Sequence, residues 1–257
     1  SMPDEHGLNA QKIRPDFVPA SDYSDAFHRL EMERLWPRVW QIACREEEIP
    51  NVGSYVNYEI GHESILVVRS APDCIRAFYN VCPHRGRRLR DDARGTLTKF
   101  FCGYHAWTFD LDGKPTSIPD RDDWKGCPQF AEEDVSMSPV RVDTWAGWVW
   151  INMDPDCVPL REYLAPLPEK LDAFEWDLCR IRSYQTIIFP INWKVALEAF
   201  VEAYHVVGTH PQLLRWGHGQ PAPIDAGPLH GAHSGSRDYK FDGSGEFTDP
   251  RKYLAST

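Results

Sequence analysis

The 257-residue sequence has no apolar run that approaches the roughly 18 residues a membrane-spanning helix requires. It also has no basic, apolar leader at its N-terminus, and Ser1 ahead of Met2 reads as a scar of tag removal. Basic residues are the minority, with 28 Lys and Arg against 38 Asp and Glu, so the net charge is −10. These features predict a cytoplasmic protein with neither a membrane nor a nucleic acid as its partner.

The sequence also lacks a pattern of paired cysteines. Its seven cysteines are an odd number, and two of them, Cys82 and Cys102, belong to motifs that are described next. Free thiols in a reducing compartment explain the other five better than disulfides do. These scattered cysteines are Cys44, Cys74, Cys127, Cys157 and Cys179.

Two short motifs each combine one thiol with one imidazole. The first is Cys82-Pro83-His84-Arg85-Gly86, and the second is Cys102-Gly103-Tyr104-His105-Ala106-Trp107. The spacings are C-x-H and C-x-x-H, with 17 residues between His84 and Cys102. Four soft or borderline ligands at this spacing predict a metal site built on two facing loops.

Two metals compete for this site, and four unrelated core residues are a third interpretation. Zinc accepts two Cys and two His in a tetrahedron, but its usual pattern places the two Cys together and the two His together. Mixed loops suit a [2Fe–2S] cluster with two Cys on one iron and two His on the other, which is a Rieske centre. Neutral imidazoles leave such a cluster less negative, so it accepts an electron at a higher potential than a four-thiolate cluster.

Short runs rich in β-branched and aromatic residues surround the two motifs. They predict strands at residues 40–44, 54–58, 64–69, 75–79, 97–101, 107–110, 140–145 and 147–152. A helix that begins near Ser24 and is stopped by Pro37 precedes them, and Asp112-Gly113 forms a hairpin turn between two of them. Residues 38–155 are therefore predicted to form a small antiparallel β domain with the metal at one tip.

The second half of the chain differs from the first in its predicted secondary structure and composition. Helices are predicted at residues 160–164 and 167–174, and a strand at residues 183–189. Residues 212–257 contain few apolar side chains and cannot build a core alone. The predicted class is α+β, with an N-terminal arm and helix (1–37), a Rieske [2Fe–2S] domain (38–158) and the start of an incomplete α+β catalytic domain (159–257).

A second candidate site lies on the segment 192–205. Asn192 can cap a helix that begins at Trp193. At 100° per residue, Glu198, Glu202 and His205 fall on one face of that helix.

The chain after this helix contains a second histidine. Gly208 and Pro211 oppose continuation of the helix, so we expect the chain to bend and bring His210 beside His205. Two His and one carboxylate on one side of a metal form the facial triad of non-haem Fe(II) oxygenases, which leaves positions for O2 and substrate. Two satisfied polar histidines at a helix end are the alternative, and the neighbouring cluster motifs favour the iron site.

Together the motifs resemble the large (alpha) subunit of the Rieske non-haem iron aromatic-ring-hydroxylating oxygenases. The resemblance rests on C-P-H-R-G, C-G-Y-H-A-W-T-F-D-L-D-G and N-W-K-x-x-x-E-x-F-x-E-x-Y-H-x-x-x-x-H-P, in that order, from about residue 38 to 211. It implies a Rieske β domain and a larger α+β catalytic domain, in a trimer with or without a small β subunit. The cluster ligands that it implies are Cys82, His84, Cys102 and His105, with His205 and His210 on a mononuclear Fe(II). Glu202 is then the catalytic carboxylate that bridges to a cluster histidine of the neighbouring subunit and relays the electron.

The same resemblance implies an enzyme. Electrons from NAD(P)H pass through a reductase, in some systems with a ferredoxin, to a terminal oxygenase that hydroxylates an aromatic or related small organic substrate with O2. The spacing E-x-x-x-E-x-Y-H with T-H-P also resembles the branch that includes phenylpropionate-type and quaternary-amine oxygenases. An iron–sulfur electron-transfer module without oxygenase activity is the second class of interpretation, and a zinc-binding structural protein is the third.

Two departures from the family pattern concern the mononuclear iron. Ala199 stands where the family often has Asn, which removes one polar group near the iron. The family's third ligand is a carboxylate on a later helix, and we expect it to lie beyond the sequence given. The acidic residues after His210 are predicted to be solvated loop residues, namely Asp225, Asp238, Asp242, Glu246 and Asp249.

Two further groups have both a plain and a functional interpretation. The arginines of the first motif form a local positive patch that is either a solvated, charge-balanced loop or a docking site for an acidic ferredoxin or the neighbouring subunit; they are Arg85, Arg87, Arg88 and Arg90. The tryptophans of the β region are assigned to packing, namely Trp107, Trp145, Trp148 and Trp150.

Overall fold

A computed structural model describes residues 19–119, 121–128, 130–131, 133–200, 204–210, 222–224 and 232–234. The chain divides into two units. The β unit comprises Asp25–Leu164 and Pro168–Ser183, and the second unit comprises Ser1–Ser24, Ala165–Leu167 and Tyr184–Thr257. Within the described residues, no helix combines the length and the apolar character that crossing a membrane would require.

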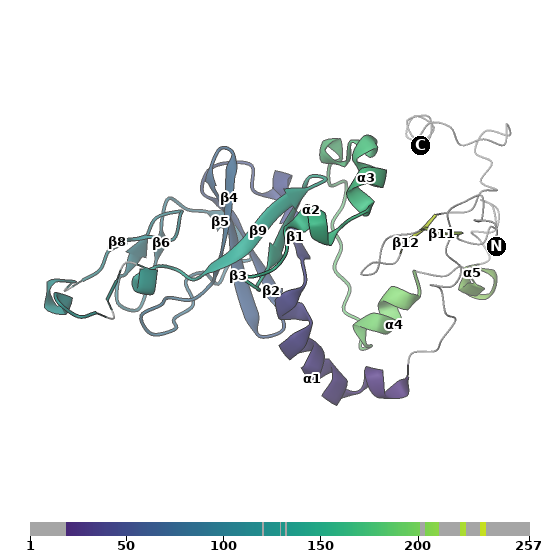
Figure 1. The fold of residues 1–257 in the computed structure, drawn as a ribbon, viewed down its shortest axis with the longest axis horizontal. Helices are drawn as coiled ribbons and strands as arrows, with labels where there is room; N and C mark the ends of the chain where they lie inside the picture. Colours follow the sequence, from purple (N-terminus) through teal and green to yellow (C-terminus); the bar gives the residue numbers. More distant parts are fainter. Residues whose placement is uncertain are drawn as a thin grey trace. The chain divides into compact units, whose positions relative to one another are not determined.

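Two antiparallel sheets build the β unit (Figure 1). The larger has seven strands in the order β1-β10-β9-β4-β3-β2-β5, and the smaller has three in the order β6-β7-β8. The strands are β1 (Gln41–Arg45), β2 (Ser54–Ile60), β3 (Glu63–Ala71), β4 (Cys74–Tyr79), β5 (Arg94–Thr96), β6 (Phe100–Phe101), β7 (Thr108–Phe109), β8 (Pro115–Ser117), β9 (Pro139–Trp145) and β10 (Trp148–Asn152). A separate pair, β11 (Ala222–Ile224) and β12 (Ala232–Ser234), belongs to the second unit.

Strand β3 shows why the larger sheet is stable. Its four central side chains, Ile65, Leu66, Val67 and Val68, are each 0% exposed. Alternate residues of a strand point to opposite faces, so Leu66 and Val68 enter one core while Ile65 and Val67 enter another. Each buried aliphatic side chain contributes about 1.5–3 kcal/mol. The core on the Leu66 side also contains Cys82 and Cys102, which ties the candidate metal loops to the centre of the fold.

A two-residue hairpin joins β9 to β10. Trp145 pairs with Trp148, and the intervening Ala146 and Gly147 have φ values of 59° and 75°. Two successive left-handed residues define the tight hairpin turn whose twist matches that of the flanking strands. At Gly147 a Cβ would lie 2.7 Å from the Arg45 guanidinium and 3.0 Å from the Asp177 Cα, so a side chain cannot be accommodated there without movement.

The helices are short. The α-helices are α1 (Asp25–Arg34), α2 (Leu160–Tyr163), α3 (Leu167–Leu171), α4 (Trp193–Glu198) and α5 (Tyr204–Thr209). The 3-10 helices are η2 (Ala20–Tyr23), η3 (Trp36–Arg38), η4 (Glu46–Glu48), η5 (Arg121–Trp124), η6 (Glu133–Val135), η7 (Asp172–Phe174) and η8 (Trp176–Leu178). In the β unit, Leu160 and Leu164 pack against Trp40, whose indole N–H donates a 2.9 Å hydrogen bond to the Val158 carbonyl.

The predicted antiparallel β region is confirmed, with all eight expected strands present. Two three-residue strands, β5 and β8, were not predicted because segments this short carry no alternating pattern. The predicted strand at residues 183–189 is wrong. That segment pairs with no strand in the described part of the chain, and Ile187, Ile188 and Phe189 are 67%, 91% and 61% exposed. Its residue types favour a strand, but an unpaired segment forms no ladder.

Candidate functional site

The two Cys/His motifs fold into loops with the same backbone hydrogen bonds. In the first loop (Cys82–Arg87), the Cys82 N–H donates to the Arg87 carbonyl at 2.8 Å. In the second loop (Cys102–Trp107), the Cys102 N–H donates to the Trp107 carbonyl, also at 2.8 Å. Each loop contains a second backbone hydrogen bond, in which the N–H of the fifth residue donates to the carbonyl of the cysteine at 3.0 Å.

The fifth residue of each loop has a left-handed backbone. Gly86 has a φ of 69° in the first loop, and Ala106 has a φ of 58° in the second. This conformation costs nothing for glycine but about 1 kcal/mol or more for alanine. The histidine is the third residue of the first loop and the fourth residue of the second, so equivalent loops present their imidazoles from different positions.

The two thiols meet in the core. Cys82 and Cys102 are each 1% exposed, and the two thiols lie close enough to influence each other electrostatically. Burial is the largest influence on Cys82 and raises its pKa to about 11. A thiol in this environment stays protonated unless a bound cation supplies compensating charge, because metal coordination deprotonates a thiol outright.

The two imidazoles also meet. The rings of His84 and His105 have centroids 4.5 Å apart and planes inclined at 67°. Burial, with a smaller contribution from His105, lowers the pKa of His84 and favours the neutral form that binds metals. The Nδ1 atom of His84 is buried and has no hydrogen-bond partner among the described residues. A buried polar atom without a partner is costly, and a metal ion would satisfy it.

This donor set fits a two-iron cluster. The thiols form one pair and the imidazoles form another, which is the division a [2Fe–2S] cluster with two Cys and two His requires. Within the part of the chain that the structure describes, no group of three or more His, Cys, Asp or Glu side chains is arranged to hold a single metal ion.

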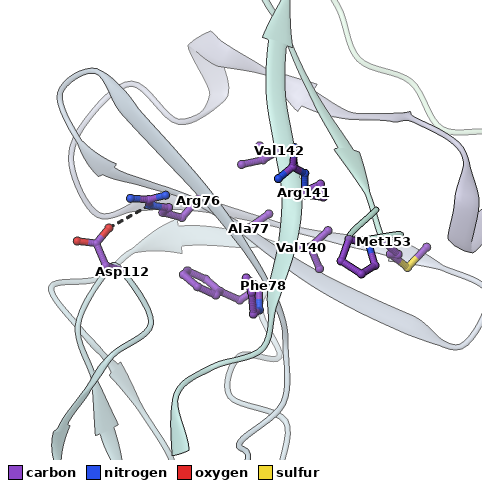
Figure 2. A pocket seen from close by; sticks show the side chains of 10 residues that line it. Arg76, Ala77, Phe78, Asp112, Val140, Arg141, Val142 and Met153 are labelled. Atoms are coloured by element: carbon purple, nitrogen blue, oxygen red, sulfur yellow. Dashed lines mark hydrogen bonds and ion pairs between the residues drawn. The ribbon is translucent and has the colours of Figure 1, made fainter. Parts of the chain in front are cut away.

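A hollow of about 470 Å³ lies beside the imidazoles. The two histidines and Trp107 form one wall of this histidine hollow, and the segment with Pro119, Asp123 and Trp124 forms the other. Asp123 and Trp124 were not singled out from the sequence, because no motif connects η5 to the two loops. A second cavity of about 510 Å³ lies along β4 and β9, where Arg76 and Asp112 form an ion pair of 3.1 Å (Figure 2). It contains none of the predicted ligands.

The arginines of the first loop differ in their partners. Arg88 pairs with Glu59 and lies 3.7 Å from Asp91. Arg90 pairs with Asp92 at 2.9 Å and donates to the Tyr55 hydroxyl at 3.0 Å. These two are therefore charge-balanced, whereas Arg85 and Arg87 are exposed and form no ion pair with another described residue.

The predicted helix at 192–205 is not continuous. As predicted, the Asn192 side chain caps α4 by accepting a 3.0 Å hydrogen bond from the Lys194 N–H. However, α4 ends at Glu198, whose carboxylate accepts 3.0 Å hydrogen bonds from the Tyr23 hydroxyl. The chain turns at Ala199 and Phe200, and α5 begins at Tyr204. Glu198 and His205 therefore lie on different helices rather than on one helical face.

The structure brings His205 and His210 together. Their ring centroids are 5.4 Å apart, with planes inclined at 81°. The helix was expected to stop near Gly208 and Pro211, and α5 ends at Thr209, immediately before His210; Gly208 itself lies within the helix. Glu202 lies outside the described residues, as do all five acidic candidates further on: Asp225, Asp238, Asp242, Glu246 and Asp249.

Comparison with known proteins gives the class of each segment. Residues 39–132 match the Rieske [2Fe-2S] domain, and residues 170–253 match the catalytic domain of the ring hydroxylating alpha subunit. A Rieske domain followed by this catalytic domain defines a class of two-centre oxygenase subunits. The chain belongs to this family, the large subunits of the Rieske non-haem iron oxygenases, whose members bind a [2Fe–2S] cluster and a mononuclear iron.

Individual relatives differ in the compounds they are named for. The carnitine monooxygenase oxygenase subunit of Escherichia coli (strain K12) is 35% identical over 198 residues, which cover 76% of this chain and 52% of that subunit. The biphenyl 2,3-dioxygenase subunit alpha of Rhodococcus jostii (strain RHA1) is 32% identical over 212 residues, covering 80% of this chain and 46% of that subunit. A structure of the quaternary ammonium Rieske monooxygenase CntA with L-carnitine has a TM-score of 0.72 at 28% identity, over 80% of this chain and 59% of that one. The chain spans about half the length of the curated relatives it matches.

Proposed function

We propose that the protein is the terminal oxygenase component of a Rieske non-haem iron system and hydroxylates a small organic substrate with O2. The observation that carries this proposal is the meeting of two buried thiols and two imidazoles on loops with the same backbone hydrogen bonds.

In this proposal, Cys82 and Cys102 hold one iron of the cluster, and His84 and His105 hold the other. The bound cluster supplies a one-electron store with a higher potential than a four-thiolate cluster. The protein keeps the thiols in the core and presents the imidazoles beside the histidine hollow. The domain boundaries follow as residues 38–158 for the cluster domain and 159–257 for the start of the catalytic domain.

The second metal would be held by His205 and His210, whose rings lie 5.4 Å apart. A carboxylate further along the polypeptide would complete the facial triad. Glu202 lies three residues before His205 and is proposed to connect a cluster imidazole of a neighbouring subunit to this iron. That route requires an oligomer, for which a trimer is the proposed form.

The substrate class we propose is a quaternary ammonium compound. The carnitine monooxygenase subunit and the CntA structure support it. Their similarity favours this class over the aromatic substrate expected from the motifs. The biphenyl dioxygenase relative, at 32% identity, keeps an aromatic substrate as the second candidate.

The product distinguishes the two substrate classes. Hydroxylation of a carbon bonded to a quaternary nitrogen consumes O2, two electrons and two protons, and it releases water. The hydroxylated carbon still bears the positively charged nitrogen; loss of the hydroxyl proton and cleavage of the C–N bond then give an aldehyde, a tertiary amine and H⁺. An aromatic substrate instead retains the new hydroxyl groups on its ring. Full-length protein supplied with NADH, a reductase and carnitine should release a tertiary amine, whereas ring hydroxylation of biphenyl without amine release from carnitine would support the aromatic candidate.

The electrons are proposed to come from an NAD(P)H-dependent reductase, directly or through a ferredoxin. Exposed Arg85 and Arg87 beside the cluster loops offer positive charge to an acidic partner. All seven cysteines are free, which supports a reducing compartment such as the cytoplasm.

Iron counting separates this proposal from its alternatives. Three irons per full-length chain support the oxygenase, and two support an electron-transfer module without its own oxygenase activity. A colourless protein that contains zinc and gives no paramagnetic signal after reduction would exclude both.

A further inference from the structure

The indole of Trp107 stacks on the imidazole of a proposed cluster ligand, His84. Its indole lies parallel to the imidazole of His84, with 2° between the planes and 4.8 Å between the centroids. The indole is buried, with 5% of its surface exposed. We propose that Trp107 is a positioning residue that holds the His84 ring in the orientation the cluster needs and keeps water from one of its faces.

Contacts other than His84 fix the indole itself. Trp107 is the last residue of the second loop, and its carbonyl accepts the hydrogen bond that closes that loop. Its ring lies 6.4 Å from Phe109, which is 0% exposed, and 6.0 Å from Phe130 at an angle of 81°. Phe130 in turn stacks on Trp124 at 5.1 Å. Contacts with rings other than His84 therefore position the indole, and none of them requires a bound cluster.

Before a metal binds, the buried Nδ1 atom of His84 gives the ring no hydrogen-bond support, because it has no partner within the described ranges. The contacts that define the ring plane are therefore the parallel indole and the inclined ring of His105 at 4.5 Å. A ligand ring whose plane is fixed in advance loses less freedom when it binds a metal.

Among the described residues, no ring lies parallel to that of the other ligand histidine, His105. The aromatic neighbour of His105 is Tyr104, which is tilted by 37° at 3.8 Å and is 60% exposed. The first loop ends in exposed Arg87, at the position where the second loop ends in Trp107. The two loops have the same backbone hydrogen bonds, but only the second loop supplies an aromatic ring, and this ring supports the histidine of the first loop.

This inference rests on the proposed [2Fe–2S] cluster and predicts a change in its reduction potential. Replacing the indole by Leu lets water reach the covered face of His84. Water stabilises the reduced cluster, which carries one more negative charge, so the potential should rise. At a fixed applied potential, we expect the ratio of reduced to oxidised cluster to increase about threefold or more in Trp107→Leu. The EPR line shape should also change, because it reports ligand orientation.

Phe109→Leu is the matched control. Phe109 belongs to the same core as Trp107, and its buried ring contacts the indole. Its removal therefore tests whether a loss of packing alone changes the reduction potential of the cluster. Optical redox titration, EPR and thermal melting of holo-protein are measured for the wild type and both variants. The proposal is supported if both variants melt earlier but only Trp107→Leu shifts the potential and line shape. An unchanged potential in Trp107→Leu, or equal shifts in both variants, overturns it.

If the Trp107→Leu variant does not fold, the same measurements are made on Trp107→Phe. The smaller ring covers less of the imidazole, so a smaller shift in the same direction is expected, and an unchanged potential overturns the proposal. Failure of the proposed cluster looks different, because the wild-type protein would then contain nothing to reduce. Failure of the proposed oxygenase activity alone would leave the wild-type cluster reducible and this comparison of potentials unaffected.

Discussion

The guanidinium of Arg45 donates a 2.6 Å hydrogen bond to the carbonyl of Cys179, which lies 134 residues further along the chain. It also donates to the carbonyls of Ala146 at 3.0 Å and Trp176 at 3.2 Å. The group lies over the ring of Trp148 at 4.9 Å, and Arg45 is only 5% exposed. One buried cation thereby fastens the segment after η8 to the β9–β10 hairpin.

The first prediction concerns this buried arginine. Arg45→Met retains the volume but leaves three carbonyls without their donor, and we expect it to reduce the free energy of unfolding by about 2–4 kcal/mol. Arg45→Lys keeps the charge but not the planar fork of donors, so a smaller loss of about 1–2 kcal/mol is expected. Urea unfolding of the metal-free protein measures both.

Arg87→Met is the control for this series, since Arg87 is exposed. Its stability should change by less than about 0.5 kcal/mol. An Arg45→Met protein as stable as the wild type would show that the three hydrogen bonds contribute nothing net.

The second prediction uses the equivalent left-handed positions of the two loops. Gly86→Ala introduces a side chain at φ 69° where nothing lies within 4 Å of the new Cβ, so the cost is backbone strain alone, about 1 kcal/mol. Ala106→Gly relieves strain at φ 58° and should stabilise the metal-free protein by up to about 1 kcal/mol. Thermal melting compares them, and a stabilising Gly86→Ala would refute the shared geometry.

The third prediction concerns thiol reactivity. Burial is the main cause that raises the pKa of Cys44 to about 12, with the nearby carboxylates of Glu48 and Glu46 adding to it. The reactive thiolate is therefore only about 10⁻⁴ of this group at pH 8 and increases as pH rises toward 12. Cys179 is exposed. In native protein, a thiol reagent followed by peptide mass spectrometry should label Cys179 first and Cys44 only after unfolding.

Early labelling of Cys44 at pH 8 would contradict its placement in the core. The Cys179→Ser variant provides the control, because it should lose the fast phase of labelling and retain the slow one.

The fourth prediction tests the proposed electron relay. Glu202→Gln removes the charge but keeps the size of the side chain, so the visible spectrum of the cluster should remain while product formation is abolished. Glu198→Gln is a matched comparison on α4, where the carboxylate is bonded to the Tyr23 hydroxyl. Full turnover in Glu202→Gln would remove the relay role.

Much of this architecture was predictable from the sequence. The continuous apolar run of β3 and the alternation of β9 are strong local signals, and the motif spacings predicted that two Cys and two His meet at one tip. The indole of Trp107 could not be assigned beyond packing, because its stacking on His84 depends on how two loops meet. The sequence places Trp107 two residues after His105, but the ring on which it stacks is that of His84 in the other loop.

The helical predictions were weaker for a physical reason. Polar and apolar residues alternate with helical periodicity over residues 192–205. Such periodicity predicts a helix, but it does not predict the residue at which a short helix ends. The turn at Ala199 and Phe200 has no Gly or Pro to mark it, and Gly208 lies inside α5 although it usually weakens a helix. Contacts such as Tyr23 with Glu198 join residues far apart in the chain and leave no local signal.

The most direct test of the account is a redox titration of anaerobically purified protein, combined with iron and acid-labile sulfide analysis. Cluster ligation by Cys82, His84, Cys102 and His105 predicts two labile sulfides per chain and a reduction potential within about −150 to +300 mV. Cys82→Ser and His84→Ala should each abolish the signal. A potential near −400 mV, typical of four thiolate ligands, or a protein without labile sulfide, would contradict the central claim.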